Sequence, residues 1–177
     1  ELSRQIIRKK PKLLILFDIS ELALYSIESE LSEINQGVKV IPILGDITNG
    51  SRLGKVIKKF EIQTIYHAAA YKHVPMVEKN TVAGIRINIF GTLSCIQAAI
   101  DGNVENFVFI STDKAVRPTN IMGATKRFAE LILQAISKQQ SKSDIHNKIR
   151  ISMVRFGNVL DSSGSVVPLF RQQIKQG

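Results

Sequence analysis

The residues best suited to chemistry lie in one short stretch, Ser111-Thr112-Asp113-Lys114. The stretch follows an apolar run typical of a buried strand, and ligands bind beyond the carboxyl ends of strands in open parallel sheets. A carboxyl group beside an amine can act as general acid and general base on neighbouring carbons of one substrate. We therefore predict that Asp113 and Lys114 form an acid–base pair. The alternative is a solvated turn.

Met122 and Lys126 follow a few residues later and are one helical turn apart. Residues at i and i+4 share a helix face, so both side chains would point the same way from a helix beginning near Ile121. A lysine at that place can hold the ribose of a nicotinamide cofactor. The alternative is an ordinary amphipathic helix, and the combination of the two stretches argues against it.

These residues need a scaffold, and the apolar pattern indicates one in which β-rich runs alternate with helical ones. Continuous apolar runs favour strands buried on both faces, and stripes of period 3.6 favour helices. Strands are expected at 13–17, 38–44, 64–70, 106–111 and 150–156, and helices at 1–8, 20–35, 51–60, from 81 onward and 121–138. This alternation predicts an α/β fold with a doubly wound parallel, Rossmann-like sheet.

Caps and buried faces can also be assigned to the helices. Ser20 and Ser51 are expected to be N-caps. The helix that starts near Thr81 would bury Ile85, Ile89, Leu93 and Ile96, and the helix at 121–138 would bury Phe128, Leu131, Ile132 and Ala135.

Small or polar residues follow the other strands and would reach the same sheet edge. Asp18 can accept hydrogen bonds from a ribose, Asp46 and Ile47 can approach an adenine, and Ala68-Ala69-Ala70 would allow the backbone close to a ligand. Turn formation and tight packing explain each of them about equally well. Lys72 and His73 could meet a phosphate or a sugar hydroxyl. The histidines have no partners at metal-ligand spacing, so no metal site is predicted.

Composition limits the classes of partner. The chain has 177 residues, 44% of them hydrophobic, and a net charge of +9, which fits one globular domain that meets a dinucleotide, a nucleotide-sugar or an acidic membrane face. Aromatic residues make up only 6%, which argues against nucleic acid. The single cysteine, Cys95, is expected to be buried and inert in a reducing cytoplasm. No run of about 18 apolar residues indicates a membrane span.

The expected fold lacks one part. A dinucleotide-binding domain opens with a strand and a glycine-rich turn that places pyrophosphate against a helix N-terminus. Residues 1–8, with Leu2, Ile6 and Ile7 apolar, instead suit the helix that follows such a turn. We expect residues 1–177 to be a truncated NAD(P)-binding domain that lacks the first strand and the glycine-rich turn.

Several blocks of the sequence resemble one family, the CapD-like polysaccharide biosynthesis proteins, which are extended short-chain dehydrogenases/reductases. The most specific block is Ser-Thr-Asp-Lys-Ala-Val-Arg-Pro-Thr-Asn-Ile-Met-Gly-Ala-Thr-Lys-Arg at 111–127, and others occupy 68–76, 88–92, 155–159 and 164–168. The resemblance covers essentially the whole chain. It implies a UDP-N-acetylglucosamine 4,6-dehydratase that uses NAD or NADP.

The resemblance also implies roles. Hydride would leave C4 of the sugar, water would be eliminated across C5 and C6, and the hydride would return to C6. Lys114 would remove the C5 proton and Asp113 would protonate the departing C6 hydroxyl. Lys126 would bind the cofactor ribose, Ser111 and Asn88 would support the cofactor side, and 157–177, with Asn158 and Ser165, would lead into the nucleotide-sugar region.

One position departs from the wider superfamily, in which a tyrosine four residues before the lysine accepts the C4 hydroxyl proton. Met122 occupies that position, and a thioether cannot accept this proton. A methionine-containing subgroup, whose longer members often carry membrane-spanning helices, is similar in this respect. Thr112, Asp113, or Lys126 through a water remain candidate acceptors.

The sequence leaves rival functions open. A nucleotide-sugar 4-epimerase shares the fold and cofactor but needs no acid–base pair at C5 and C6, and a non-catalytic dinucleotide-binding module would explain Met122. For the intact protein we expect a cytoplasmic homo-oligomer that binds a UDP-sugar, with an anchor to the inner membrane possible in a longer parent chain.

Overall fold

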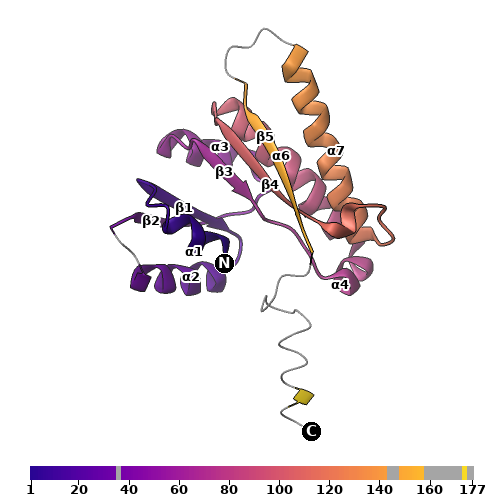
Figure 1. The fold of residues 1–177 in the computed structure, drawn as a ribbon, viewed down its shortest axis with the longest axis horizontal. Helices are drawn as coiled ribbons and strands as arrows, with labels where there is room; N and C mark the ends of the chain where they lie inside the picture. The colour runs from indigo at the N-terminus through magenta and orange to yellow at the C-terminus, as the bar shows by residue number, and fades with distance from the viewer. Residues whose placement is uncertain (35–36, 143–147, 158–172, 175–177) are drawn as a thin grey trace.

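Strands and helices alternate along the chain in the computed structural model of the protein, which describes residues 1–34, 37–142, 148–157 and 173–174 (Figure 1). The strands are β1 (Leu13–Asp18), β2 (Lys39–Leu44), β3 (Thr64–His67), β4 (Asn106–Thr112) and β5 (Arg150–Phe156). The helices are α1 (Leu2–Ile7), α2 (Glu21–Ile34), α3 (Gly50–Phe60), α4 (Val74–Lys79), α5 (Thr81–Ile85), the π-helix η1 (Arg86–Gly91), α6 (Thr92–Asp101), the 3₁₀ turn η2 (Asp113–Ala115) and α7 (Ile121–Lys142).

All the described strand pairs are parallel, and they form two sheets. β1 pairs with β2, and β4 lies between β3 and β5 in a three-stranded sheet. Parallel strands joined by helical crossovers are the pattern of a Rossmann-like α/β fold. The predicted fold class is confirmed.

A gap separates the two sheets between β1 and β3. Within the described residues these strands form no ladder with each other, and a cavity of about 700 Å³ lies between them. Its walls are mainly apolar side chains of β1, β3, α1, α2 and α3, including Leu14, Leu16, Ile57 and Ile65. The gap resembles the interior of a sheet. Among the described residues, the facing edges of β1 and β3 have no hydrogen-bonded neighbouring strand, and both border this apolar space.

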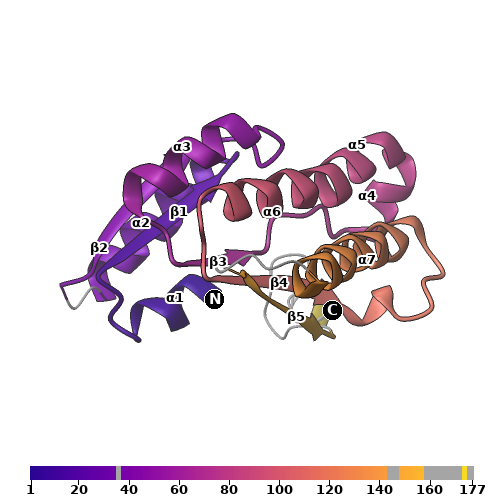
Figure 2. The same ribbon diagram turned by 90° about the horizontal axis from the view of Figure 1, so that it is seen from above.

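Two clusters of buried side chains hold the layers together. Phe107, Phe109, Ile96 and Leu133 centre the larger one, in which α3, α6 and α7 pack on the three-stranded sheet. Figure 2 shows α6 and α7 on one side of that sheet. The smaller cluster joins α1 and α2 to β1 and β2 through residues such as Leu16 and Leu31. Burying a side chain of this size stabilises the fold by roughly 1.5–3 kcal/mol.

The buried face of α7 is not the predicted one. Phe128 is 55% exposed, Leu131 is 45% exposed and Ala135 is also exposed, while Ile132 is half-buried. The buried side consists of Met122, Gly123, Thr125, Lys126, Ala129, Glu130 and Leu133. Polar contacts made by this side, described below, outweigh the apolar stripe and set the rotation of the helix.

The buried face of the helical run Thr81–Asp101, which contains the π turn η1, also differs from the predicted one. Ile96 is fully buried as predicted, but Leu93 is 39% exposed, and Ile85 and Ile89 are only partly buried. Up to Ile96, the buried positions are Gly84, Asn88, Gly91, Thr92, Cys95 and Ile96, so the buried face lies about one residue before the predicted stripe. The shift brings Asn88 into the interior, where it is fully buried.

Other local predictions fared differently. Ser20 caps α2 by accepting a hydrogen bond from the Ala23 amide, but Asn49, not Ser51, caps α3. β3 ends at His67, so Ala68–Ala70 belong to a loop, and α4 was not predicted. Cys95 is buried as expected, and burial raises the pKa of its thiol to about 12.

The helical run Thr81–Asp101 is long and apolar enough to cross a membrane by length and composition alone. Nearly half of its most apolar window, 44%, is buried inside the domain. Packing on the core, through residues such as Cys95 and Ile96, therefore accounts for its composition.

Candidate active site at the carboxyl edge

The predicted acid–base pair lies in a tight turn at the end of β4. The Lys114 ammonium nitrogen is 3.1 Å from Asp113 Oδ1, and the Thr112 hydroxyl donates to the same oxygen at 3.0 Å. Thr112 Oγ1 also accepts from the Lys114 amide and caps η2. The hydrogen bond from Lys114, followed by that from Thr112, lowers the pKa of Asp113. Asp113 is therefore a carboxylate in the resting site.

The start of α7 is fixed against this turn. A Cβ added at Gly123 would collide with the backbone carbonyl of Lys114, so only glycine allows the helix to approach so closely. Asn120 Oδ1 accepts from the Gly123 amide at 2.8 Å, and Glu78 Oε1 accepts from the Ile121 amide at 2.7 Å. These contacts satisfy amides that a helix start leaves open. The sequence analysis missed all three residues, although an asparagine just before a helix is a typical cap.

Met122 and Lys126 lie on the buried side of α7, with exposed fractions of 4% and 6%. The Lys126 ammonium nitrogen lies 4.2 Å from the centre of the Phe109 ring, in a cation–π contact. Burial lowers the pKa of Lys126 to about 8, although the nearby Glu130 opposes that shift. The amine thus lies beneath the site, and its pKa of about 8 is close to neutral pH.

His67 is a buried group that the sequence analysis assigned no role. Its Nε2 lies 2.8 Å from Thr92 Oγ1, and the Thr92 hydroxyl donates to the Asn88 carbonyl at 2.7 Å. Because that proton is already used, Nε2 must carry the hydrogen of the neutral ring. Burial, and then the charge of Lys126, lower the pKa of His67 to about 3.

Asn88 joins the loop after β3 to α7. Its Oδ1 accepts from the Tyr71 amide at 2.8 Å, and its Nδ2 donates to the Tyr71 carbonyl and to Thr125 Oγ1. The side-chain amide of Asn88 thus bonds both backbone groups of Tyr71, as a neighbouring strand would, and holds the loop that carries Lys72 and His73. The role of Asn88 toward a cofactor stays a prediction.

Ser111 belongs to a buried ionic network around Glu130. The Ser111 hydroxyl donates to Glu130 Oε1 at 2.7 Å, and Arg155 donates to both carboxylate oxygens at 2.8 and 2.7 Å. Arg127 adds a bond at 2.9 Å. Burial alone would raise the pKa of Glu130, which is 1% exposed, but the hydrogen bonds from Arg155, Ser111 and Arg127 bring it to about 2. Sequence reasoning missed this network, although a glutamate four residues after Lys126 was a signal.

Four of the ten residues predicted to meet the cofactor border the gap between the sheets. Asp18, Ile47, Ala68 and Ala69 line the cavity there. Asp18 is exposed and holds the Ser20 amide. Asp46 accepts hydrogen bonds from the Thr48 amide and hydroxyl. The hydrogen bond from the amide contributes most to lowering the pKa of Asp46. An exposed carboxylate at one strand end, with small side chains at the other, fits a dinucleotide.

The remaining predicted residues are placed only in part. Ala70 follows Ala69 in the same loop and is half-buried, while Lys72 and His73 are exposed. Asn158 and Ser165 lie outside the described residues. The structure therefore brings the Asp113–Lys114 turn and the ends of β1 and β3 to the carboxyl edges of the two sheets, and the roles expected for them stay predictions.

Comparison with known proteins gives a consistent family. The model of a family described as "Polysaccharide biosynthesis protein" matches residues 1–177. Capsular polysaccharide biosynthesis protein CapD of Staphylococcus aureus is 44% identical over all of this chain and 29% of its own length. An uncharacterised membrane protein of Methanocaldococcus jannaschii is 41% identical over all of this chain and 50% of its own.

Relatives named for two reactions match about equally well. A UDP-N-acetylglucosamine 4,6-dehydratase (inverting) of Campylobacter jejuni is 34% identical over 95% of this chain and 47% of its own length. A UDP-glucose 4-epimerase of Rickettsia canadensis is 35% identical over 92% and 47%. Among solved structures, Pen from Bacillus thuringiensis superposes with a TM-score of 0.86 at 35% identity, covering 99% of this chain and 53% of that one. The chain spans 29–53% of the length of these proteins.

Proposed function

The chain belongs to the polysaccharide biosynthesis protein family, and we propose that it carries the catalytic centre of a UDP-N-acetylglucosamine 4,6-dehydratase. The observation that carries this proposal is the Asp113–Lys114 pair, 3.1 Å apart at the carboxyl end of β4. Dehydration across C5 and C6 needs a base and an acid on adjacent carbons, and this turn offers both within one residue.

The residues of the chain account for every proton in the reaction. A bound nicotinamide would supply the redox chemistry by taking hydride from C4 and returning it to C6. Lys114 first releases the proton of its resting ammonium to solvent. As the free amine it then takes the C5 proton that the C4 ketone makes acidic, while Asp113 protonates the C6 hydroxyl as it leaves as water. When hydride reaches C6, the Lys114 ammonium gives its proton back to C5.

Asp113 needs a proton before it can act as an acid, because its lowered pKa leaves it ionised at rest. Oxidation of C4 releases a proton at that moment. The Thr112 hydroxyl donates to Asp113 at 3.0 Å, so it can pass its proton to Asp113 as it accepts the one from the C4 hydroxyl. This relay removes the need for a tyrosine at the position of Met122, and the site returns to its starting protonation after each turnover.

The competing reaction is 4-epimerisation, which the equally similar epimerase relative supports. An epimerase has no use for a base at C5. Turnover of UDP-N-acetylglucosamine by the full-length protein in deuterated water distinguishes them, because the dehydratase incorporates deuterium at C5. A 4-epimer without deuterium at C5 would refute the proposed reaction.

The base can be tested by substitution. We expect Lys114→Ala in the full-length protein to lower kcat by at least a hundredfold, since general catalysis contributes about 10²–10⁴. Lys79→Ala, on the exposed end of α4, is the matched control. Unchanged turnover in Lys114→Ala would remove this lysine from the mechanism.

We propose that NAD or NADP lies across the carboxyl end of the gap between β1 and β3, and that one more parallel strand fills the gap itself. Right-handed crossovers place such a strand beside β1 if α1 connects the two. On this proposal residues 1–177 form an incomplete NAD(P)-binding domain that passes into the substrate region at 157–177. Calorimetry with NAD should show weak binding to residues 1–177 and tight binding once the strand and its turn are present. Tight binding to residues 1–177 would contradict it.

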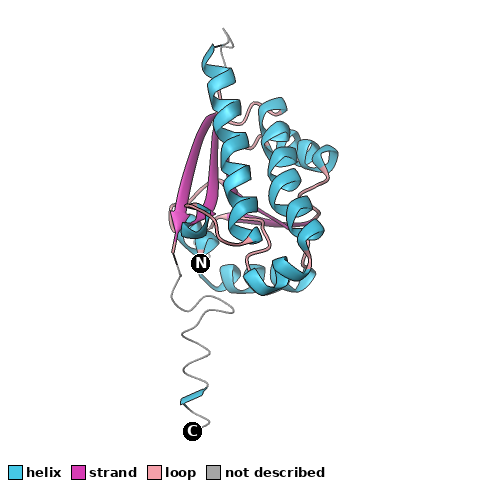
Figure 3. Cartoon of the chain, turned by 90° about the vertical axis from the view of Figure 1, so that its right-hand side faces the viewer, coloured by secondary structure: helices cyan, strands magenta, loops and turns pink. Residues whose placement is uncertain are grey.

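We also propose that two copies associate through the outer faces of α5, η1, α6 and α7. Val82, Phe90, Leu93, Phe128 and Leu131 are all substantially exposed there, at 39–81%, and the helices that carry them lie side by side (Figure 3). Exposed apolar patches of this kind mark association sites. Phe128→Glu should convert a dimer to a monomer in sedimentation experiments, and a dimer that persists would refute this interface.

For the whole protein we propose a cytoplasmic catalytic domain at the inner membrane. One relative that covers this entire chain is named a membrane protein. Fractionation of cells that express the full-length protein tests the location, because recovery in the soluble fraction alone would contradict it.

A further inference from the structure

We infer that the amino-terminal edge of the two sheets, opposite the candidate active site, is a docking surface for anionic phospholipid headgroups. The inference rests on the proposed membrane location and is independent of the proposed reaction. Its basis is an asymmetric distribution of charge.

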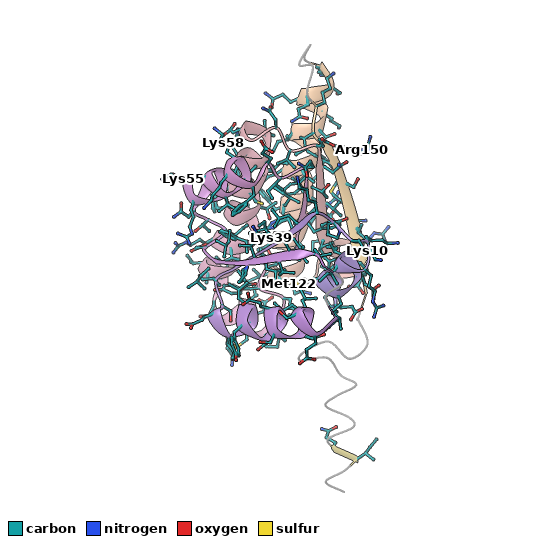
Figure 4. The ribbon with its side chains drawn as sticks, turned by 90° about the vertical axis from the view of Figure 1, so that its left-hand side faces the viewer. Lys10, Lys39, Lys55, Lys58, Met122 and Arg150 are labelled. Atoms are coloured by element: carbon teal, nitrogen blue, oxygen red, sulfur yellow. The ribbon has the colours of Figure 1, made fainter. Side chains whose placement is uncertain are left out.

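Basic residues concentrate where helices end and the following strands begin. Twelve exposed lysines and arginines occupy these positions: Arg8, Lys9, Lys10, Lys12, Lys39, Lys55, Lys58, Lys59, Lys138, Lys142, Lys148 and Arg150. Five carboxylates share the described part of this edge, Glu30, Glu33, Glu61, Asp101 and Glu105, and Glu30 is paired with Arg4. Figure 4 labels Lys10, Lys39, Lys55, Lys58 and Arg150, which spread across one view above α2.

One of these cations, Lys59, lies over the Phe60 ring at 5.3 Å from its centre. Among the described residues, none of the twelve takes part in an ion pair. Lysines near helix C-termini, such as Lys58 and Lys142, are partly explained by the helix dipole. That explanation does not extend to Lys10 in the turn before β1, or to Lys39 and Arg150 at strand starts.

The opposite edge has a different electrostatic character. There Lys114 is paired with Asp113, and Arg86 lies 4.0 Å from Asp46. Asp18, Glu21 and Glu78 add negative charge to that side. Lys72, Lys79 and Arg117 are positive there as well, so the charges of this edge nearly cancel, whereas the amino-terminal edge keeps a large positive excess.

Anionic lipid fits this surface better than nucleic acid does. Ten of the twelve cations are lysines, which attract phosphates as point charges but lack the planar fork that reads base edges. The chain has no tryptophan and few aromatic residues for stacking on bases. A hollow of about 430 Å³ between α3 and α6, lined by Lys55 and Lys58, adds room for a phosphate group. A domain docked this way would present its carboxyl edge to the cytoplasm, where nucleotide-sugars are dissolved.

The test is flotation of residues 1–177 with vesicles of phosphatidylglycerol and phosphatidylcholine, against pure phosphatidylcholine. Flotation is used because aggregated protein sediments, and only vesicle-bound protein rises with the lipid. Each basic residue near an anionic leaflet strengthens binding by roughly fivefold, so we expect binding to the anionic vesicles only, weakened at high salt. The variant K10E/K39E/K58E should bind at least tenfold more weakly. The variant K72E/K79E/R117E changes charge equally on the opposite side and should bind like the unaltered chain.

Three results would overturn the inference: no binding to anionic vesicles, an equal loss in both triple variants, or tighter binding to an oligonucleotide of equal charge than to the vesicles. Circular dichroism of each variant shows that it is folded. Because no turnover is measured, failure of the proposed reaction would leave this result unaffected, and failure here would leave the reaction untouched.

Discussion

The backbone carbonyl of Lys114 occupies the space that a side chain at position 123 would need. The start of α7 and the acid–base turn are therefore in direct contact, and Gly123 sets their separation. The clash would involve backbone, which cannot rotate away as a flexible side chain can.

The first prediction follows from this contact. Gly123→Ala must push α7 away from the turn, and we expect it to lower the free energy of unfolding by about 1–3 kcal/mol, as overpacking does. Urea unfolding measures the change. Gly54→Ala in α3 is the matched control, because nothing lies within 4 Å of an added Cβ there. That change should be neutral or stabilise by up to roughly 1 kcal/mol. Equal effects at the two sites would contradict the assignment.

A second prediction concerns the carboxylate of Glu130. Glu130→Gln leaves Arg155 and Arg127 facing a neutral amide, and we expect a loss of about 3 kcal/mol at pH 7. Because the folded-state pKa is about 2, lower than in the unfolded chain, the stabilisation is complete above pH ~4.5 and disappears as the pH falls toward 2. The difference between wild type and variant in urea unfolding should shrink over that interval. Glu33→Gln, exposed on α2, is the control, and a difference that does not vary with pH would be contrary to this account.

A third prediction is that His67 dominates the pH dependence of the free energy of unfolding between pH 6.5 and pH 5, above the range in which Glu130 acts. The buried ring has a pKa of about 3, so below pH 6.5 the unfolded chain takes up a proton that the folded chain does not. We expect a loss of about 2 kcal/mol between pH 6.5 and pH 5. His67→Gln should flatten this dependence, whereas His73→Gln, at an exposed position, should retain it. Denaturant unfolding of the wild type and of both variants at pH 6.5 and pH 5 measures these changes in the free energy of unfolding.

The fourth prediction tests the link made by Asn88. In Asn88→Asp the acceptor for the Tyr71 amide remains, but both donations are lost and a carboxylate faces the Tyr71 carbonyl. An unsatisfied buried group costs roughly 1–3 kcal/mol, so the loop should open more often. Hydrogen exchange at the Tyr71 amide should accelerate about tenfold or more while exchange in α2 stays unchanged. A uniform increase across the chain would indicate general destabilisation.

The strands and their ends could be predicted from sequence because a parallel strand leaves a continuous apolar run. The bounds of β5 matched the expected range, and the acid–base turn followed β4 as its position implied. The rotation of α7 could not be predicted in this way. The pattern favoured Phe128 and Leu131 as buried residues, yet partners distant in sequence, Ser111 and Arg155, hold Glu130 inside.

The π turn at η1 was equally hidden. No residue type signals it, and the burial of Asn88 inside it is accompanied by contacts with Tyr71 and Thr125, which are distant in sequence. The end of β3 was misplaced for a different reason. Ala68–Ala70 are apolar and continue the pattern of the strand, although β3 ends at His67.

The open edges of β1 and β3 have a practical consequence for handling the protein. Unpaired strand edges beside an apolar space are templates that extended segments of other chains can join. Residues 1–177 on their own should therefore be prone to aggregate through the gap between the sheets. Filling that gap would remove the hazard by turning two short edges into the interior of one continuous sheet.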